Sequence, residues 1–139
     1  MRVLITGGAG FIGSHLVEHY QHQAEVLVLD NLRTGRRENL QGLKCTLIEG
    51  SILDESRLGE LMKGVDLVFH LAAMVSVPES MSAPRDCVRM NAEGTLMVLE
   101  AATRAKVRKL CFSSTSAIYG DDPEMPKHEA MVPRPISPY

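Results

Sequence analysis

A glycine-spaced turn near the N-terminus constrains this chain more than any other feature of its sequence. Gly7, Gly10 and Gly13 follow the apolar run 3–5 and overlap the start of residues 11–21, whose apolar side chains recur at helical spacing. Glycines spaced in this way allow a tight turn from a strand into a helix, close approach of the backbone to a phosphate, and close packing of the helix. The pattern alone is equally consistent with glycines that serve packing only.

The rest of the chain alternates strand patterns with helix patterns. Apolar runs at 25–30, 45–48, 66–71 and 109–113 predict four further strands, and such runs without alternation are typical of a parallel sheet covered on both faces. We expect a helix after Asp54 that Gly64 ends, and a long helix from about Asp86 to Lys106. This order predicts an α/β, doubly wound parallel Rossmann sheet with helices on both faces and strand order 3-2-1-4-5. The proline-rich residues 121–139 are interpreted either as a tail or as an ordered loop.

Size, charge and cysteine content narrow the class of protein. The 139 residues are enough for one domain with a sizeable core, but not for two. Fifteen basic and 17 acidic residues give a net charge of −2, so we expect neither a nucleic-acid nor a membrane partner. The N-terminal apolar run is too short for a signal peptide, and no run is long enough to span a membrane. Cys45, Cys87 and Cys111 lie far apart, which indicates free thiols, no metal site and a cytoplasmic protein.

Asp30 ends the second predicted strand, downstream of the glycine turn. A carboxylate there can accept hydrogen bonds from both hydroxyls of an adenosine ribose and repel a 2′-phosphate, which favours NAD over NADP. The alternative is an ordinary turn residue at the end of a strand. Arg33, Arg36 and Arg37 follow, and they leave two interpretations open: a group that contacts a 2′-phosphate, or a solvated basic loop.

Six spaced blocks of this sequence resemble the extended short-chain dehydrogenase/reductase family, which includes NAD-dependent epimerases and dehydratases. The blocks are Thr6–Leu16, Asp30–Leu32, His70–Ala73, Asn91 with Gly94-Thr95, Ser113–Thr115 and Tyr119-Gly120. Within that family the chain is most similar to UDP-glucose and UDP-N-acetylglucosamine 4-epimerases, through Ser76–Ser80 and the ending Ser137-Pro138-Tyr139.

The resemblance implies that the chain binds NAD through residues of the glycine turn and of the loops that follow later strands. These are Gly7, Gly10, Phe11, Ile12, Gly13, Asp30, Asn31, Ser51, Ile52, Leu71, Ala72, Ala73, Asn91 and Ser113. Ser51 departs from the family, which usually has an aspartate there against the adenine amino group, although a serine hydroxyl can still accept one hydrogen bond. Without the resemblance, Asn91 is equally an ordinary buried amide. We interpret His70 as a structural histidine, and five methionines (Met62, Met74, Met81, Met90 and Met97) as core and gap-filling residues.

The resemblance also implies a UDP-sugar substrate and a 4-epimerase reaction. Thr115 would hydrogen-bond the 4-oxygen of the sugar, Tyr139 would take the hydroxyl proton while hydride passes from C4 to NAD, and Ser76 and Val77 would border the sugar. The 4-keto sugar then turns over and takes the hydride back on its other face. Taken singly, a Ser/Thr run after a strand and a tyrosine among prolines are ordinary turn and packing features.

Ser116-Ala117 favours epimerisation over the related reactions. Similar 4,6-dehydratases place an Asp-Glu pair at these positions and uronate decarboxylases a glutamate at the second, so either chemistry would lack an acid or base here. The alternatives are a dehydratase, decarboxylase or reductase of the same family, or a stand-alone dinucleotide-binding module. The sugar pair stays open.

Members of the family place a lysine four residues after the tyrosine, a position beyond Tyr139, which is the last residue of this chain. We therefore expect residues 1–139 to be the NAD-binding part alone, without the substrate-binding domain and without turnover of its own. Because the family pairs through helices that include the one expected at 86–106, the resemblance also implies a homodimer.

Overall fold

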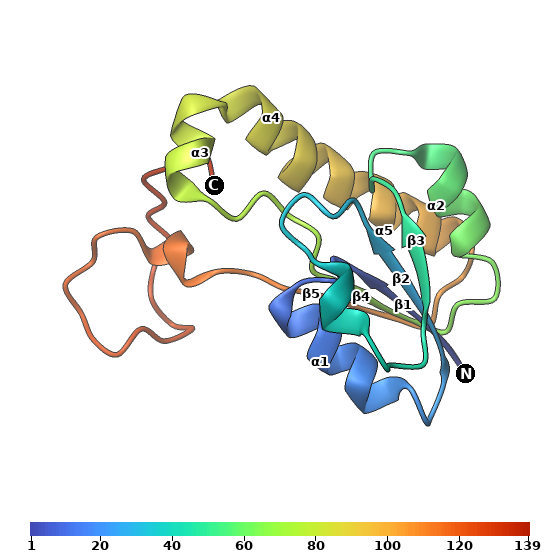
Figure 1. Ribbon diagram of the computed structural model, residues 1–139. Coiled ribbons are helices and arrows are strands. Elements are labelled where there is room, and N and C mark those ends of the chain that lie inside the picture. The colour runs from blue at the N-terminus through green and yellow to red at the C-terminus, as the bar shows by residue number, and fades with distance from the viewer.

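The computed structural model describes all 139 residues and confirms the predicted parallel sheet. Its five strands lie in the order β3-β2-β1-β4-β5, and every neighbouring pair is parallel. The strands are β1 (Arg2–Thr6), β2 (Glu25–Asp30), β3 (Thr46–Glu49), β4 (Leu67–His70) and β5 (Lys109–Phe112). As Figure 1 shows, helices cover both faces of this sheet. All five carboxyl ends therefore meet at one edge, where such folds bind their ligands.

Five α-helices connect the strands: α1 (Phe11–Tyr20), α2 (Glu55–Leu61), α3 (Val77–Ser82), α4 (Pro84–Val88) and α5 (Gly94–Arg104). The helix predicted over 86–106 forms, but a π-turn, η2 (Arg89–Glu93), separates α4 from α5 within it. Short 3-10 turns, η1 (Arg37–Leu40) and η3 (Ser116–Tyr119), lie in two loops. Helix α3 was not predicted.

Local capping explains where two of these helices begin. The Asp54 carboxylate accepts a hydrogen bond from the Arg57 N–H at 3.0 Å, so α2 starts at the predicted cap. Gly64, at φ +72°, turns the chain after α2. In α3, the Ser76 hydroxyl accepts from the Glu79 N–H at 3.2 Å and Pro78 occupies the first turn, where its missing N–H costs no hydrogen bond.

The sheet separates two hydrophobic cores, because successive side chains of each strand point to opposite faces. On β1, Val3 and Ile5 are fully buried on the side of α1, where they join Val17. Leu4, equally buried, faces the other way and joins Leu58 of α2 and Val98 of α5 among others. A β1 strand that is buried on both faces fits its position at the centre of the sheet.

Residues 121–139 form a loop without helix or strand, and the chain end returns to lie near α3 (Figure 1). Gly120 starts this loop at φ +58°, and a Cβ atom on it would come within 2.2 Å of the Arg134 carbonyl oxygen. The Arg134 N–H donates to the Ile118 carbonyl at 2.8 Å. Of the two interpretations of the proline-rich segment, the structure shows the ordered loop. Nowhere in the structure is a helix both long and apolar enough to cross a membrane.

Candidate functional site

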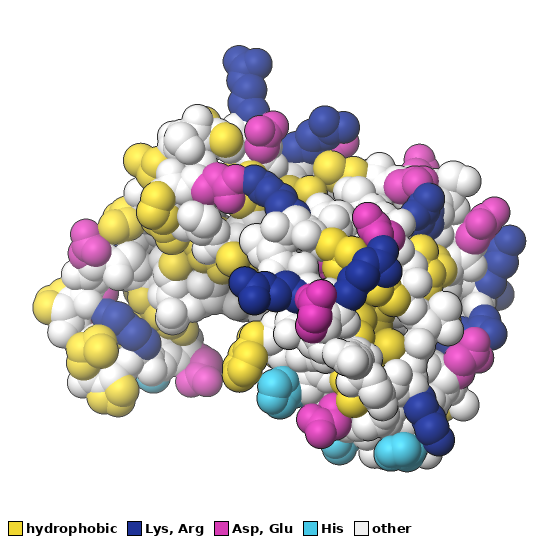
Figure 2. All heavy atoms as spheres, viewed as in Figure 1, with side chains coloured by type: hydrophobic (Ala, Val, Ile, Leu, Met, Phe, Trp, Pro, Cys, Tyr) yellow, Lys and Arg dark blue, Asp and Glu magenta, His cyan; other side chains and the backbone are white.

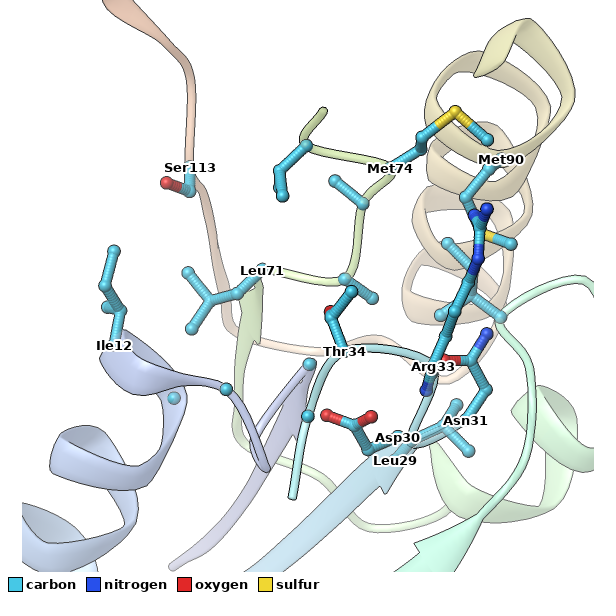
Figure 3. Close-up of a pocket in the computed structure, with 18 of the residues that line it drawn as sticks. Ile12, Leu29, Asp30, Asn31, Arg33, Thr34, Leu71, Met74, Met90 and Ser113 are labelled. Atoms are coloured by element: carbon cyan, nitrogen blue, oxygen red, sulfur yellow. Dashed lines mark hydrogen bonds between the residues drawn. The ribbon is translucent and has the colours of Figure 1, made fainter. Parts of the chain in front are cut away.

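A cleft of about 510 Å³ lies at the edge of the sheet where the strands end. The loops that follow all five strands line it, and so does the last residue, Tyr139. Figure 3 shows part of this lining, with Ile12, Asp30, Leu71 and Ser113 around the cavity. Its volume lies within the range of small-molecule and cofactor sites, about 300–1,000 Å³. This is the position at which a doubly wound sheet binds a ligand.

One wall of the cleft is the glycine turn and the first turn of α1. Gly7 has φ +72°, a conformation that favours glycine, and a Cβ atom on Gly13 would lie 2.4 Å from the Gly7 carbonyl oxygen. The turn and the helix can therefore pack this closely only because both positions are glycine. No side chain caps α1, and its first turn carries no acidic residue, in contrast to α2 and α3. The N–H groups of Phe11 and Ile12 have no intrahelical acceptor, so the positive end of this helix is available to an anion such as a pyrophosphate.

Phe11 and Ile12 expose large apolar side chains at this wall, with 79% and 59% of their surfaces accessible. Both residues line the cleft. A ligand that places its phosphates at the helix end would therefore also cover apolar surface that water now contacts.

Asp30 lies at the end of β2, and its carboxylate points toward the glycine turn (Figure 3). Its two oxygens accept backbone hydrogen bonds from Ala9 at 2.9 Å and from Leu32 at 2.8 Å. A Cβ atom on Gly35 would crowd this carboxylate at 2.9 Å. Asp30 thus fastens the turn to the strand, and because each carboxylate oxygen can accept more than one hydrogen bond, it keeps capacity for ribose hydroxyls.

Two of the three arginines after β2 form ion pairs with carboxylates, and Arg36 does not. Arg33 donates to Glu79 of α3, and Arg37 donates to Glu49 of β3. Arg33 lines the cleft beside Asp30 and Asn31, whereas Arg37 does not. Figure 2 shows the wider pattern on this face of the molecule, where basic and acidic side chains are interspersed and neither sign dominates.

The loop after β3 contributes Ser51 and Ile52 to the cleft. The Ser51 hydroxyl oxygen accepts a hydrogen bond from the Leu53 N–H at 3.1 Å, so Ser51 also stabilises its own turn. Ile52 is 3% exposed and packs against Gly94, where an added Cβ would come within 2.6 Å of it. The hydroxyl of Ser51 retains one lone pair and its proton for a ligand.

A buried hydrogen-bonded chain supports the wall made by the loop after β4. His70 is 1% exposed; its Nδ1 lies 2.7 Å from Thr6 Oγ1, and its Nε2 lies 2.9 Å from Thr95 Oγ1. Thr6 Oγ1 already accepts the N–H groups of Leu71 and Ala72, each at 3.2 Å, so its proton must go to Nδ1.

The other end of this chain fixes the tautomer of His70. Thr95 Oγ1 donates to the Asn91 carbonyl at 2.6 Å, so it accepts the proton on Nε2. His70 is therefore neutral, with its hydrogen on Nε2, and burial lowers its pKa to about 4. Both ring nitrogens are used within the protein, which agrees with a structural role.

Asn91 lies in the π-turn and holds the loop after β4 by its backbone. Its Oδ1 accepts from the Met74 N–H at 2.8 Å, and its Nδ2 donates to the Met74 carbonyl at 3.0 Å. Met74 is 4% exposed, so these backbone groups have little access to water. Asn91 itself does not line the cleft, whereas Leu71, Ala72 and Ala73 do.

The far end of the cleft combines Ser113 and Ser114, after β5, with Tyr139. Thr115 lies next to them but does not line the cleft, and its hydroxyl oxygen accepts the Ala117 N–H at 3.2 Å as the cap of η3. Ser76 lines the cleft and caps α3, whereas Val77, at 40% exposure, does not line it. Tyr139 thus lies on the same cavity as the glycine turn, although the two are at opposite ends of the chain.

Besides Arg33, which the sequence offered as a possible phosphate contact, nine residues that line the cleft were not predicted as site residues. They are Leu29, Thr34, Gly35, Gly50, Met74, Val75, Glu79, Met90 and Ser114. Most of them adjoin residues that the sequence singled out, so adjacency was the available signal. Met90 and Glu79 come from helices that approach the cleft only in the folded chain. No group of three or more His, Cys, Asp or Glu residues in the structure is arranged to hold a metal ion.

Known proteins that are similar to this chain belong to one family of enzymes. The family model for the NAD dependent epimerase/dehydratase family matches residues 3–139. The UDP-glucose 4-epimerase of Klebsiella pneumoniae is 39% identical over an alignment 139 positions long, which covers 94% of this chain and all of that protein.

Two solved structures are similar over the whole chain. The UDP-glucose 4-epimerase of Thermotoga maritima with UDP-glucose has a TM-score of 0.93 at 42% identity, and that of Thermus thermophilus in complex with NAD has a TM-score of 0.91 at 43% identity. This chain spans 46% of the length of each of them.

Proposed function

The chain belongs to the NAD-dependent epimerase/dehydratase family, and from this premise we propose that its cleft binds NAD and that the whole protein is a UDP-sugar 4-epimerase. The observation that carries the proposal is the composition of the cleft. The end of α1 without a side-chain cap and the Asp30 carboxylate, which is placed to bind ribose hydroxyls, lie in one cavity with Ser113, Ser114 and Tyr139. NAD supplies the hydride acceptor and donor of such a reaction.

The residues present fit a dinucleotide. The N–H groups at the start of α1 bind the pyrophosphate, because no side chain competes for them. Asp30 binds the ribose hydroxyls with the lone pairs that Ala9 and Leu32 leave free. Asn31, Ser51 and Ile52 border the adenine, and the loop that Asn91 holds presents Leu71, Ala72 and Ala73, with Ser113 beyond them.

The proton chemistry is assigned to Tyr139, which lines the far end of the cleft, and to Thr115, which follows the lining residue Ser114. Tyr139 takes the proton of the 4-hydroxyl group, and Thr115 hydrogen-bonds the 4-oxygen with its hydroxyl proton, which the contact with the Ala117 N–H leaves free. Tyr139 returns this proton to the 4-oxygen when the 4-keto sugar has turned over and regains the hydride at C4, while Thr115 again hydrogen-bonds the 4-oxygen and keeps its own proton. Ser76 borders the sugar from the loop before α3, with Val77 next to it.

The sugar pair is either glucose and galactose or their N-acetylated forms. Ser116 and Ala117 carry no carboxyl group, which supports epimerisation over elimination or decarboxylation. The three cysteines are unpaired, which supports a reducing compartment, the cytoplasm. Val88, Leu96 and Leu99 expose apolar surface along α4 and α5, which supports a homodimer through these helices; light scattering on the purified protein tests it.

The first experiment is a titration of the purified protein with NAD and NADP, beside Asp30→Ala and Asp30→Asn. We expect tighter binding of NAD than of NADP in the unmodified protein, and a loss of at least tenfold in NAD affinity in both variants, since Asn cannot offer two charged acceptors. Absence of NAD binding would overturn the proposal.

The reaction is tested on the full-length protein that carries this chain, supplied with UDP-glucose and, separately, UDP-N-acetylglucosamine. We expect interconversion with the 4-epimer and no net reduction of NAD. Loss of water or release of CO₂ would instead identify a dehydratase or a decarboxylase. Binding of NAD without any turnover would identify a dinucleotide-binding module. Tyr139→Phe should abolish turnover and retain NAD binding.

A further inference from the structure

Two side chains at the adenosine end of the cleft, Asp30 and Arg33, have opposite effects on a 2′-phosphate. Asp30 repels a 2′-phosphate, whereas an arginine is the side chain best suited to bind one, and Arg33 lies three residues after Asp30 in the same cleft. Of the three arginines that follow β2, only Arg33 lines the cavity. What Arg33 binds therefore bears on which dinucleotide the cleft accepts.

In the structure, Arg33 binds Glu79. The guanidinium Nη2 donates to Glu79 Oε1, and Figure 3 shows the Arg33 side chain extending away from the Asp30 carboxylate, toward the helical segment that carries Met90. The two residues are 46 positions apart in the sequence, and their contact joins the loop after β2 to α3. Both side chains line the cavity, so the pair belongs to the site rather than to the outer surface.

Glu79 is fixed at its base. Its backbone N–H donates to the capping hydroxyl of Ser76, and the next residue, Ser80, is fully buried with its hydroxyl donating to the Val77 carbonyl at 2.7 Å. Helix α3 thus presents the Glu79 carboxylate at a defined place above the cleft, where it can hold a flexible arginine side chain.

We propose that Glu79 is a specificity-determining residue: by engaging Arg33, it withholds from a 2′-phosphate the one cation in the cleft and so adds to the discrimination by Asp30 against NADP. This inference rests on the proposed binding of NAD. Asp30 repels the phosphate, and Glu79 removes the group that would compensate for that repulsion.

The size of the effect follows from the exposure of the pair. The side chains of Arg33 and Glu79 are 46% and 37% exposed, so solvent screens their attraction. An ion pair of this kind contributes at most about fivefold, or about 1 kcal/mol, to an equilibrium. Release of Arg33 should therefore change the ratio of the two dinucleotide affinities by about two- to fivefold. Asp30 still favours NAD.

The test is a set of titrations with NAD and with NADP on the purified protein and on Glu79→Gln, Arg33→Gln and the double variant. The measured quantity is the ratio of Kd for NADP to Kd for NAD. Glu79→Gln should lower this ratio by about two- to fivefold, and the same change should have no effect when Arg33 is already Gln. Circular dichroism verifies that each variant is folded.

Glu49→Gln is the matched control, because it frees Arg37, which belongs to the same loop but does not line the cleft. The control should leave the ratio unchanged. An unchanged ratio in Glu79→Gln overturns the inference, and so does an equal change in the Arg33→Gln background, which would mean that Glu79 repels the phosphate directly. An unmodified protein that binds no NAD overturns the proposed function itself, and the inference with it.

Discussion

His70 should make the stability of this protein fall in acid, by an amount that its burial sets. Its pKa is lowered from 6.5 to about 4, because both ring nitrogens are enclosed between Thr6 and Thr95 and the charged form loses its hydration. The unfolded chain therefore takes up a proton near pH 6.5 that the folded chain takes up only near pH 4. Between these values, protonation favours unfolding, and the folded state is at its most stable above pH 6.5.

The magnitude follows from the two values. A tenfold change in proton affinity corresponds to about 1.4 kcal/mol, so this one group should cost the folded state about 2 kcal/mol at pH 5 and about 3 kcal/mol at pH 4, relative to pH 7. Carboxylates also titrate in this range, and a variant that lacks only the imidazole separates their contribution from that of His70.

The assay is urea unfolding between pH 4 and pH 7, of the unmodified protein and of His70→Gln. Circular dichroism is the appropriate signal, since the chain contains no tryptophan. His70→Gln will lower the free energy of unfolding at neutral pH, but the difference between the two proteins should shrink by about 3 kcal/mol from pH 7 to pH 4. Parallel curves over this range would refute the assignment of a buried, neutral His70.

Three further substitutions test how the cleft and its supports are built. Asn91→Ala removes both contacts to the Met74 backbone and should cost about 2–4 kcal/mol in urea unfolding, since two buried backbone groups lose their partners; a cost below about 0.5 kcal/mol would show that the loop needs no such support. Gly13→Ala should prevent α1 from seating on the turn, where the new methyl group would meet Gly7 and Gly8 backbone atoms at 2.4 and 2.5 Å, whereas Gly59→Ala, with no atom within 4 Å, should stabilise α2 by about 0.5–1 kcal/mol. Equal effects of these two changes on the melting temperature would contradict the close packing. Asp54→Ala should cost about 1 kcal/mol in the same measurement, because the Arg57 N–H loses its acceptor, and an unchanged stability would argue against the cap.

The sheet could be predicted because its determinants are local. Each strand is a short apolar run ended by a turn residue, and these runs match the observed strands to within one or two residues at each end. The order of the strands then followed from the right-handed connections of doubly wound sheets. The two ends of α2 could be predicted from Asp54 and Gly64 for the same reason, since a cap and a turn glycine act on the residues next to them in the sequence.

The features that could not be predicted are either too short for a sequence pattern or form only when segments distant in the sequence come together. Helix α3 has six residues and a proline in its first turn, which is too short for a periodic pattern. The π-turn at 89–93 has no sequence signature in this chain, because the contact that accompanies it, from Asn91 to Met74, forms only when the loop after β4 reaches the helix. Glu79 and Met90 join the cleft for the same reason.

The central position of β1 also has a consequence for the order in which the protein is assembled during synthesis. Strand β1 pairs with β2 on one side, so the contact between Asp30 and Ala9 can close once the first 30 residues have left the ribosome. Its other edge stays uncovered until β4, at residues 67–70, has been synthesised. A nascent chain between these two points presents an unpaired strand edge whose three middle residues, Val3, Leu4 and Ile5, are apolar, and unpaired edges of this kind favour aggregation. The interval in which this chain most needs a chaperone therefore lies between completion of β2 and completion of β4.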